Sequence, residues 1–200
     1  MDNGQEKLYE IKSTFFTLPN SLTLLRIILV PFFVSALLKQ KQSAAFFIFL
    51  AASLTDLLDG LIARIWHQKS MAGLWLDPVA DKLLLFSSFF TLSLSEYAHP
   101  NVIPWRVFWV VLGKDLLILI GALALIILKK KSHFPPTYSG KTATVCQVLT
   151  IMAVLLLNFL GKELSLLSWL YDLTILSTVV AGLQYIWVGI TVLKNSPEQN

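Results

Sequence analysis

The sequence contains the stretch Asp56-Leu-Leu-Asp59-Gly60-Leu-Ile-Ala63-Arg64 and, eight residues later, Gly73-Leu-Trp-Leu-Asp77-Pro-Val-Ala-Asp81. On a helix, a stripe about 140° wide holds Asp56, Asp59, Gly60, Ala63 and Arg64. A second stripe on the next helix, at i, i+4 and i+8, holds Gly73, Asp77 and Asp81. If the two stripes face each other, four carboxylates converge beside small residues. Such a cluster repels itself unless cations neutralise it or some of the acids stay protonated.

The spacing of these residues carries further information. The pattern Asp-x-x-Asp-Gly-x-x-Ala-Arg, eight residues, Gly-x-x-x-Asp-x-x-x-Asp resembles the signature of the CDP-alcohol phosphatidyltransferase family at all eight defined positions. The resemblance extends from about residue 18 to about residue 150. It implies an integral membrane enzyme that transfers a phosphatidyl group from CDP-diacylglycerol to an alcohol and releases CMP. It also implies a homodimer, in which small residues such as Gly121 and Ala122 could pack.

The composition independently favours a membrane protein. Of 200 residues, 56% are hydrophobic and 14% are charged, and the mean hydropathy is +0.69, which is typical of polytopic membrane proteins. The single cysteine excludes an internal disulfide. No zinc-type cysteine and histidine cluster is present, so a bound metal would take oxygen ligands, which favours Mg²⁺, Mn²⁺ or Ca²⁺. The net charge of +4 does not indicate nucleic-acid binding.

Six continuously apolar segments predict an all-α, polytopic membrane protein with six transmembrane helices. We place the segments near residues 19–39, 44–65, 75–96, 104–128, 143–160 and 167–193. Residues 1–17 have apolar side chains at roughly helical spacing and are expected to form an amphipathic helix on the membrane surface; the alternative is a frayed terminus. We therefore expect one membrane domain over 18–194 and a cytoplasmic tail over 195–200.

Basic residues in the loops predict the orientation. Most of them fall near the two termini and in the loops after the second and fourth segments, which places these regions in the cytoplasm of a multi-pass protein of the inner, cytoplasmic membrane. The acidic motif flanks the loop after the second segment. We therefore expect the active site to open to the cytoplasm, where soluble nucleotides and phosphorylated alcohols are found.

The resemblance assigns roles to the four acids. It implies that Asp56, Asp59 and Asp77 are metal ligands, and that Asp81 is the catalytic general base and also contacts a metal. Two divalent ions, Mg²⁺ or Mn²⁺, would share the cluster and clamp the pyrophosphate of the donor. The alternative is that these are ordinary interfacial acids, but carboxylates inside a membrane are costly and indicate function.

The resemblance also implies a donor nucleotide site beside the acids. Gly60 and Ala63 would leave room for the cytidine and its phosphates, and Arg64 would contact the diphosphate; close helix packing and positive-inside anchoring are the alternatives. Gly73 would admit close approach or turn the chain.

The first segment opens with the motif Pro19-Asn20-Ser-Leu-Thr23-Leu-Leu-Arg26, which resembles the first helix of the family. Asn20 and Thr23 are candidates for the donor site. The alternative is helix capping by Asn20 or Ser21. Arg26 is the weaker candidate, because snorkelling toward the headgroups would also explain it.

Two lysines are candidates for binding the phosphate of the acceptor. Lys114 and Asp115 lie inside the fourth segment and need partners there; because they point about 100° apart, we expect them to pair with other helices and not with each other. Lys141 lies in a Gly-Lys-x-x-Thr-x-x-Gln pattern, Gly140 to Gln147, that resembles the start of the fifth helix in the family. The alternative for Lys141 is a surface lysine.

The form Asp77-Pro-Val-Ala-Asp81-Lys82 resembles the branch of the family that uses glycerol-3-phosphate, so CDP-diacylglycerol and glycerol-3-phosphate are the expected substrates. The last third of the chain is interpreted as generic apolar helix. Three alternatives stay open: a cardiolipin synthase of the same family that uses phosphatidylglycerol, a cation transporter, and a catalytically inactive scaffold.

Overall fold

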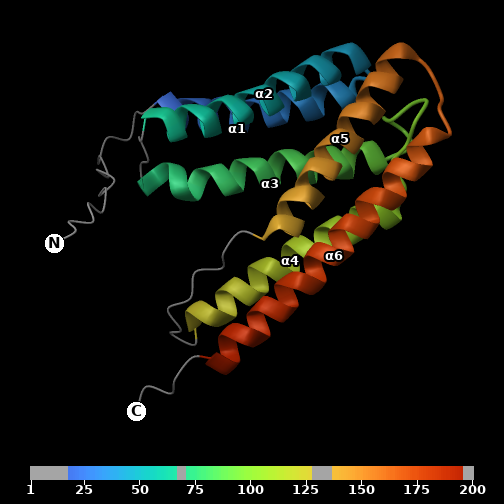
Figure 1. The fold of residues 1–200 in the computed structure, drawn as a ribbon. Coiled ribbons are helices and arrows are strands. Elements are labelled where there is room, and N and C mark those ends of the chain that lie inside the picture. The colour runs from blue at the N-terminus through green and yellow to red at the C-terminus, as the bar shows by residue number, and fades with distance from the viewer. Residues whose placement is uncertain (1–17, 67–70, 128–136, 196–200) are drawn as a thin grey trace. The chain divides into compact units, whose positions relative to one another are not determined.

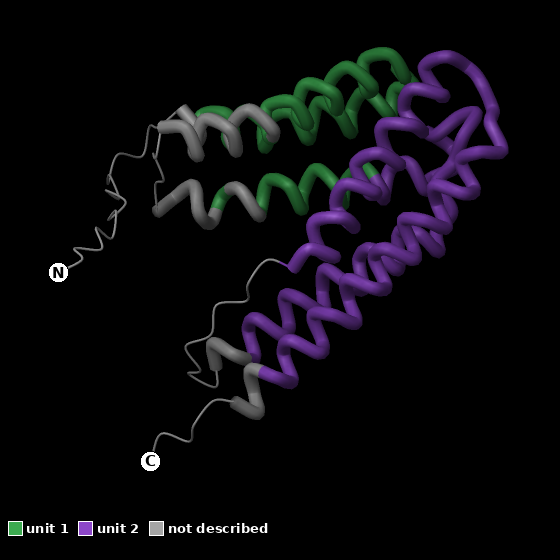
Figure 2. Tube along the Cα trace, viewed as in Figure 1, with its two compact units in different colours: residues 1–88 green, residues 89–200 purple. Residues whose placement is uncertain are grey.

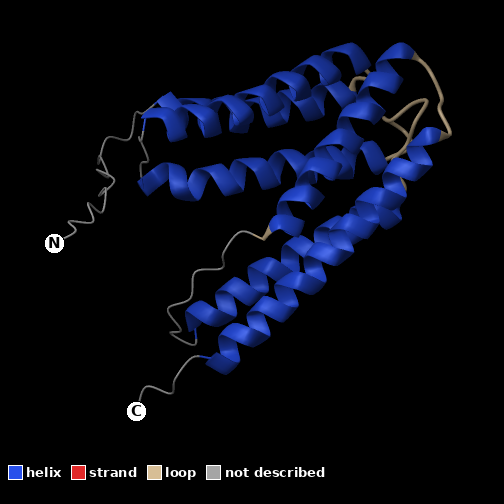
Figure 3. Ribbon diagram, in the orientation of Figure 1, coloured by secondary structure: helices blue, strands red, loops and turns tan. Residues whose placement is uncertain are grey.

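The structure, a computed structural model, describes residues 18–66, 71–127 and 137–195. These ranges form helices and connecting loops and contain no strand (Figures 1 and 3). The helices are α1 (Leu18–Leu38), α2 (Gln42–Trp66), α3 (Met71–Ser93), α4 (Trp105–Ile127), α5 (Tyr138–Leu160) and α6 (Leu166–Asn195). The all-α prediction is confirmed, whereas the amphipathic helix predicted over 1–17 and most of the tail lie outside the described residues.

The chain divides into two compact units within α3 (Figure 2): unit 1 covers residues 1–88 and unit 2 covers residues 89–200. In unit 1, α1 and α2 lie side by side (Figure 1) and are joined by a short turn in which Gln40 has a φ of 54°. Phe33 and Phe49 are fully buried, with ring centroids 5.8 Å apart. Ala45 and Ala52 are also buried, and such small residues let two helices approach closely.

In unit 2, α6 packs against both α4 and α5. A reciprocal pair of buried asparagines connects α5 to the loop between α3 and α4. The backbone and side-chain N–H groups of Asn101 donate to Asn158 Oδ1 at 2.8 and 2.9 Å, and Asn158 Nδ2 donates to the Asn101 carbonyl at 3.0 Å. Each asparagine thus provides hydrogen-bond partners for the other in a place from which water is excluded.

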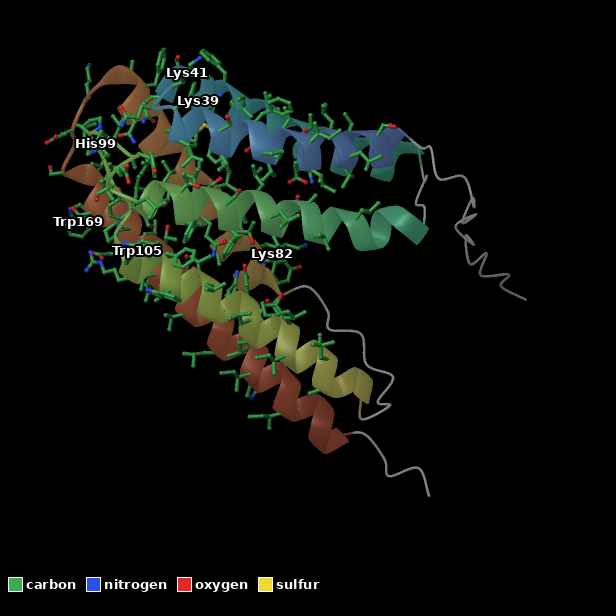
Figure 4. The ribbon with its side chains drawn as sticks, turned by 180° about the vertical axis from the view of Figure 1, so that it is seen from behind. Lys39, Lys41, Lys82, His99, Trp105 and Trp169 are labelled. Carbon is green, nitrogen blue, oxygen red and sulfur yellow. The ribbon has the colours of Figure 1, made fainter. Side chains whose placement is uncertain are left out.

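Unit 2 also presents aromatic side chains at the start of α4. Trp105 packs edge-on against Phe108, with ring centroids 5.5 Å apart, and it is 40% exposed. Trp169, near the start of α6, is also exposed, and both tryptophans lie near the helix starts at one end of unit 2 (Figure 4). Tryptophans at helix ends are typical of the boundary between membrane and water.

Helix α5 starts five residues before the predicted position of 143, because polar residues extend it. The Thr137 hydroxyl accepts a hydrogen bond from the Gly140 N–H at 3.1 Å and thereby caps the helix. At the other end, Gly161 has a φ of 63°, a left-handed conformation that suits glycine. The apolar run alone therefore underestimated the helix by more than a turn.

Among the described residues, four stretches are long and apolar enough to cross a bilayer: Ser21–Leu38, Trp105–Ala124, Tyr138–Leu160 and Leu166–Thr191. The described side chains of α2 form a shorter apolar stretch, Gln42–Asp56. The chain is thus a polytopic membrane protein, and spanning by α2 and α3 remains a prediction.

Candidate functional site

The centre of the candidate site is Arg26, in the third turn of α1. Its side chain is fully buried and contacts acids from two other helices. The distance from Arg26 Nη2 to Asp56 Oδ1 in α2 is 3.0 Å, and that from Nη1 to Asp81 Oδ1 in α3 is 2.5 Å. One guanidinium therefore binds an acid from each of the two stripes, which brings α1, α2 and α3 together at one point.

Burial of Arg26 rules out the snorkelling interpretation, which was wrong. A snorkelling arginine extends its charged end to water, whereas this guanidinium has no exposed surface. A planar guanidinium suits this place because its N–H groups form a rigid fork that can reach two carboxylates at once. The signal that could have identified it was a lone arginine in an apolar run, because a charge at membrane depth needs partners.

The two acids are more accessible than the arginine that joins them. The Asp56 side chain is 46% exposed and the Asp81 side chain is 40% exposed. Lys82 follows Asp81 directly and is exposed on α3 (Figure 4). Each carboxylate therefore contacts Arg26 while part of its surface remains open to a ligand.

The other predicted site residues are placed by their backbone alone. Helix α2 contains Asp59, Gly60, Ala63 and Arg64, and helix α3 contains Gly73 and Asp77. Gly73 is thus helical and does not turn the chain. Asn20 lies in the first turn of α1, and Thr23, one turn before Arg26 on the sequence, is buried. The side chains of Asn20, Asp59, Gly60, Ala63, Arg64, Gly73 and Asp77 lie outside the described part of the structure.

The chemistry of the described acids fits a hard divalent cation. Carboxylate oxygens are the ligands that Mg²⁺ and Mn²⁺ prefer. Two ionised carboxylates beside one guanidinium also leave a net negative charge, which attracts a cation. Among the described side chains, no three histidine, cysteine or acidic residues gather around one point. A complete ligand set would therefore need Asp59 or Asp77.

Lys114 and Asp115 on α4 pair with each other, so the prediction that they would not pair with each other was wrong. The distance from Lys114 Nζ to Asp115 Oδ1 is 3.0 Å, and Lys114 is only 6% exposed. The long lysine side chain bends across the 100° between neighbouring helical positions, because an unpaired ammonium would be costly at this depth.

Lys141, the other candidate for phosphate binding, is exposed in the first turn of α5. Its ammonium lies 5.8 Å from the ring centroid of Tyr138, within the range of a cation–π contact. The backbone N–H of Lys141 donates to the Thr137 carbonyl at 3.2 Å. The two lysines therefore differ: one is buried in an ion pair, and the other is accessible to a solute.

Comparison with known proteins supports a common ancestry over nearly the whole chain. The family model described as CDP-alcohol phosphatidyltransferase matches residues 16–190. A protein of Haemophilus influenzae is 32% identical over 183 residues, which cover 87% of this chain and 94% of that protein. A protein of Escherichia coli strain K12 is 35% identical over 145 residues, covering 68% and 75% of the two chains. One from Aquifex aeolicus is 34% identical over 140 residues, covering 70% and 76%. All three are named CDP-diacylglycerol–glycerol-3-phosphate 3-phosphatidyltransferase.

Proposed function

Because this chain belongs to the CDP-alcohol phosphatidyltransferase family, we propose that it is a phosphatidylglycerophosphate synthase. It transfers the phosphatidyl group of CDP-diacylglycerol to glycerol-3-phosphate and releases CMP. The observation that carries this proposal is the joining of Asp56 and Asp81, from two different helices, by the buried Arg26. The shared name of the relatives supports the choice of glycerol-3-phosphate as acceptor.

In the proposed mechanism, Asp81 removes the proton from the primary hydroxyl of glycerol-3-phosphate. The hydroxyl oxygen attacks the phosphorus that bears diacylglycerol, and the bond from that phosphorus to the oxygen of CMP breaks. Arg26 contacts the Asp81 carboxylate, so the base starts from a fixed position. Direct attack is favoured over a covalent intermediate because none of the eight defined positions of the motif is a serine, cysteine or histidine.

The family uses divalent metal ions, and we propose Mg²⁺ or Mn²⁺ held by Asp56, Asp59, Asp77 and Asp81. When bound, such ions neutralise the donor pyrophosphate and the charge that develops on the departing CMP. The accessible portions of Asp56 and Asp81 support this proposal.

Binding of the substrates is assigned to residues flanking the acids and to two lysines. The donor nucleotide is bound by Gly60, Ala63, Arg64 and Gly73, with Asn20 and Thr23. The acceptor phosphate is a dianion that needs positive charge, and exposed Lys141 is its principal cation. Lys114 is the second cation, with its charge shared with Asp115 at 3.0 Å.

We further propose that the protein is a homodimer of the inner membrane with both termini and the active site in the cytoplasm. The excess of basic residues near the termini and in two loops supports this orientation. An even number of spanning helices would also place both termini on one side.

The experiment that tests the proposed function measures CMP release from CDP-diacylglycerol by purified protein in detergent with Mg²⁺ or Mn²⁺. Glycerol-3-phosphate, phosphatidylglycerol, serine and inositol phosphate are supplied in parallel. Release with glycerol-3-phosphate alone is the expected result. Release with phosphatidylglycerol alone would instead identify a cardiolipin synthase, and no release together with metal-dependent cation flux in vesicles would identify a transporter.

A further inference from the structure

The last helix, α6, differs from the generic apolar helix that its sequence predicts. Thr174 and Thr178, one turn apart on α6, are buried against α5. The Thr174 hydroxyl lies 2.7 Å from that of Thr150, and Gln147 Nε2 donates to the Thr178 hydroxyl at 3.1 Å. Hydrogen bonds between helices fix one helix along and around another more specifically than apolar packing does.

The polar contacts continue to the first turn of α5. The hydroxyl of Ser139 donates to Gln184 Oε1. A Cβ atom added to Gly140 would lie 2.9 Å from the Tyr185 hydroxyl oxygen and 3.0 Å from Thr137 Oγ1. Real side chains do not approach this closely, so the Tyr185 hydroxyl occupies the space that a side chain at position 140 would need. A side chain at position 140 would therefore have to displace the Tyr185 ring or the Thr137 hydroxyl.

The same short stretch of α6 also contacts the helix that carries the other candidate lysine. A Cβ atom added to Gly182 would lie 3.9 Å from Lys114 Cγ on α4, which is ordinary van der Waals distance. Residues 182–185 of α6 thus lie beside the Lys114 side chain and contact the turn that immediately precedes Lys141. All of these contacts lie within unit 2.

We propose that Gln184 and Tyr185 are positioning residues for the acceptor: they fix the first turn of α5 and hence the base of the Lys141 side chain. This inference rests on the proposed function, in which Lys141 binds the acceptor phosphate. The N–H groups of Gly140 and Lys141 already donate to Thr137, so they contribute little to binding an anion. The affinity for the acceptor phosphate therefore depends on the position of the Lys141 ammonium. A long, flexible lysine gains from a fixed backbone because less freedom is lost on binding.

The test compares Gln184→Leu and Tyr185→Phe with the matched control Thr191→Val. Thr191 is also a polar residue of α6, but its hydroxyl bonds only to the Trp187 carbonyl of its own helix, at 2.9 Å. We expect Gln184→Leu to raise KM for glycerol-3-phosphate by about threefold to tenfold, the effect of one lost hydrogen bond. Tyr185→Phe removes the hydroxyl that fills the space beside Gly140 and should also raise this KM. KM for CDP-diacylglycerol and kcat should stay within about twofold, a change smaller than one such bond would cause, and the control should leave all three constants unchanged.

A rescue experiment uses the contact at Gly140. Gly140→Ala should raise the acceptor KM more than Tyr185→Phe does, because its methyl group meets the Tyr185 hydroxyl at 2.9 Å. Adding Tyr185→Phe to Gly140→Ala should recover part of the loss, since the nearest clashing atom is removed. The positioning role would be overturned if Gln184→Leu left KM for glycerol-3-phosphate unchanged. It would also be overturned if Gln184→Leu lowered kcat and left KM for both substrates unchanged.

A second readout does not depend on catalysis. Lys141→Cys, in a Cys146→Ser background, is labelled with a charged thiol reagent with and without Gln184→Leu. A changed labelling rate would show that Gln184 fixes this turn, and an unchanged rate would reject the positioning role by itself. Failure of the positioning role can be distinguished from failure of the proposed function, because only the absence of CMP release by the unaltered protein would reject the proposed function.

Discussion

Unit 1 and unit 2 both connect helices through buried polar side chains, but the chemistry of the two connections differs. In unit 1 the connection is ionic: the buried Arg26 binds Asp56 and Asp81. In unit 2, α5 and α6 are joined by neutral groups, the hydroxyls of Thr150 and Thr174 and the amide of Gln147. The α1–α2 interface also contains the buried rings of Phe33 and Phe49 and the buried alanines Ala45 and Ala52.

The difference indicates what each connection is for. Burying a charge is expensive even when it is paired, so an ionic connection is not an efficient way to hold helices together. Neutral hydrogen bonds between membrane helices cost little to bury and contribute about 0.6 kcal/mol each, at most about 1.7 kcal/mol. The ionic connection is explained if acids are needed for chemistry and Arg26 keeps them in place. The neutral connection is explained by positioning alone.

The largest effect is expected at the ionic connection. Asp81→Asn should lower kcat by about 10²–10⁴-fold, the usual contribution of a general base, because an amide cannot accept the proton of the acceptor hydroxyl. CMP release measures kcat, and binding of a CDP-diacylglycerol analogue should be retained. Asp172→Asn, which changes an exposed acid on α6, is the control. Turnover by Asp81→Asn at the rate of the unaltered protein would refute the assignment of the base.

Arg26→Gln should destabilise the protein by about 2–3 kcal/mol. Breaking a fully buried ion pair costs about 3–5 kcal/mol, but Asp56 and Asp81 are 46% and 40% exposed and can be partly rehydrated. Unfolding by SDS in mixed micelles measures the change. The matched control is Arg106→Gln, which breaks the exposed pair between Arg106 and Asp172 at 3.1 Å and should cost about 0–1 kcal/mol. Equal costs for the two arginine variants would remove the distinction between a buried and a surface pair.

Lys141→Gln should raise KM for glycerol-3-phosphate by about tenfold or more, the effect of losing one charge-assisted hydrogen bond. KM for CDP-diacylglycerol should not change. Initial rates of CMP release at varied glycerol-3-phosphate concentration measure KM for this acceptor. Lys162→Gln, which changes an exposed lysine just beyond the opposite end of α5, should leave the acceptor KM as it is. If both lysine variants raised KM for glycerol-3-phosphate equally, the effect would come from general surface charge.

The smallest effect is expected at the neutral connection. Thr150→Val and Thr174→Val remove the 2.7 Å contact between the two hydroxyls, and each should destabilise the protein by about 0.6 kcal/mol, at most about 1.7 kcal/mol. Because both groups serve one hydrogen bond, the double variant should cost less than the sum of the single variants. SDS unfolding measures all three, with Thr191→Val as the control. Additive losses would show that the hydroxyls act separately.

The sequence predicted the helices well, because long apolar runs must satisfy their backbone groups within a helix when they enter lipid. The start of α5 was missed because its first turn is polar and depends on the Thr137 cap, which hydropathy does not detect. The pairing of Lys114 with Asp115 was also missed. Angular spacing describes where two side chains leave the helix, but a lysine is long enough to bend back to its neighbour.

For the site, the sequence predicted that acids from two helices converge, and the structure brings Asp56 and Asp81 to one arginine that the sequence undervalued. Asp56 and Asp81 lie in a motif whose spacing is informative, whereas Arg26 is separated from Asp81 by 55 residues, and no local pattern reveals that contact. Gln184 and Tyr185 were missed for the same reason. Their importance depends on the close approach of Gly140 in another helix, and only the folded structure shows it.

The most direct test of the account follows isotopically labelled glycerol-3-phosphate while CMP release is measured in the same sample. We predict that label enters a chloroform-soluble lipid, phosphatidylglycerophosphate, in a one-to-one ratio with CMP, and that Asp81→Asn lowers the rate of both by about 10²–10⁴-fold. CMP release without labelled lipid would mean that water is the acceptor and would contradict the proposed transfer. Labelled lipid formed at an undiminished rate by Asp81→Asn would contradict the role of the acids that Arg26 joins.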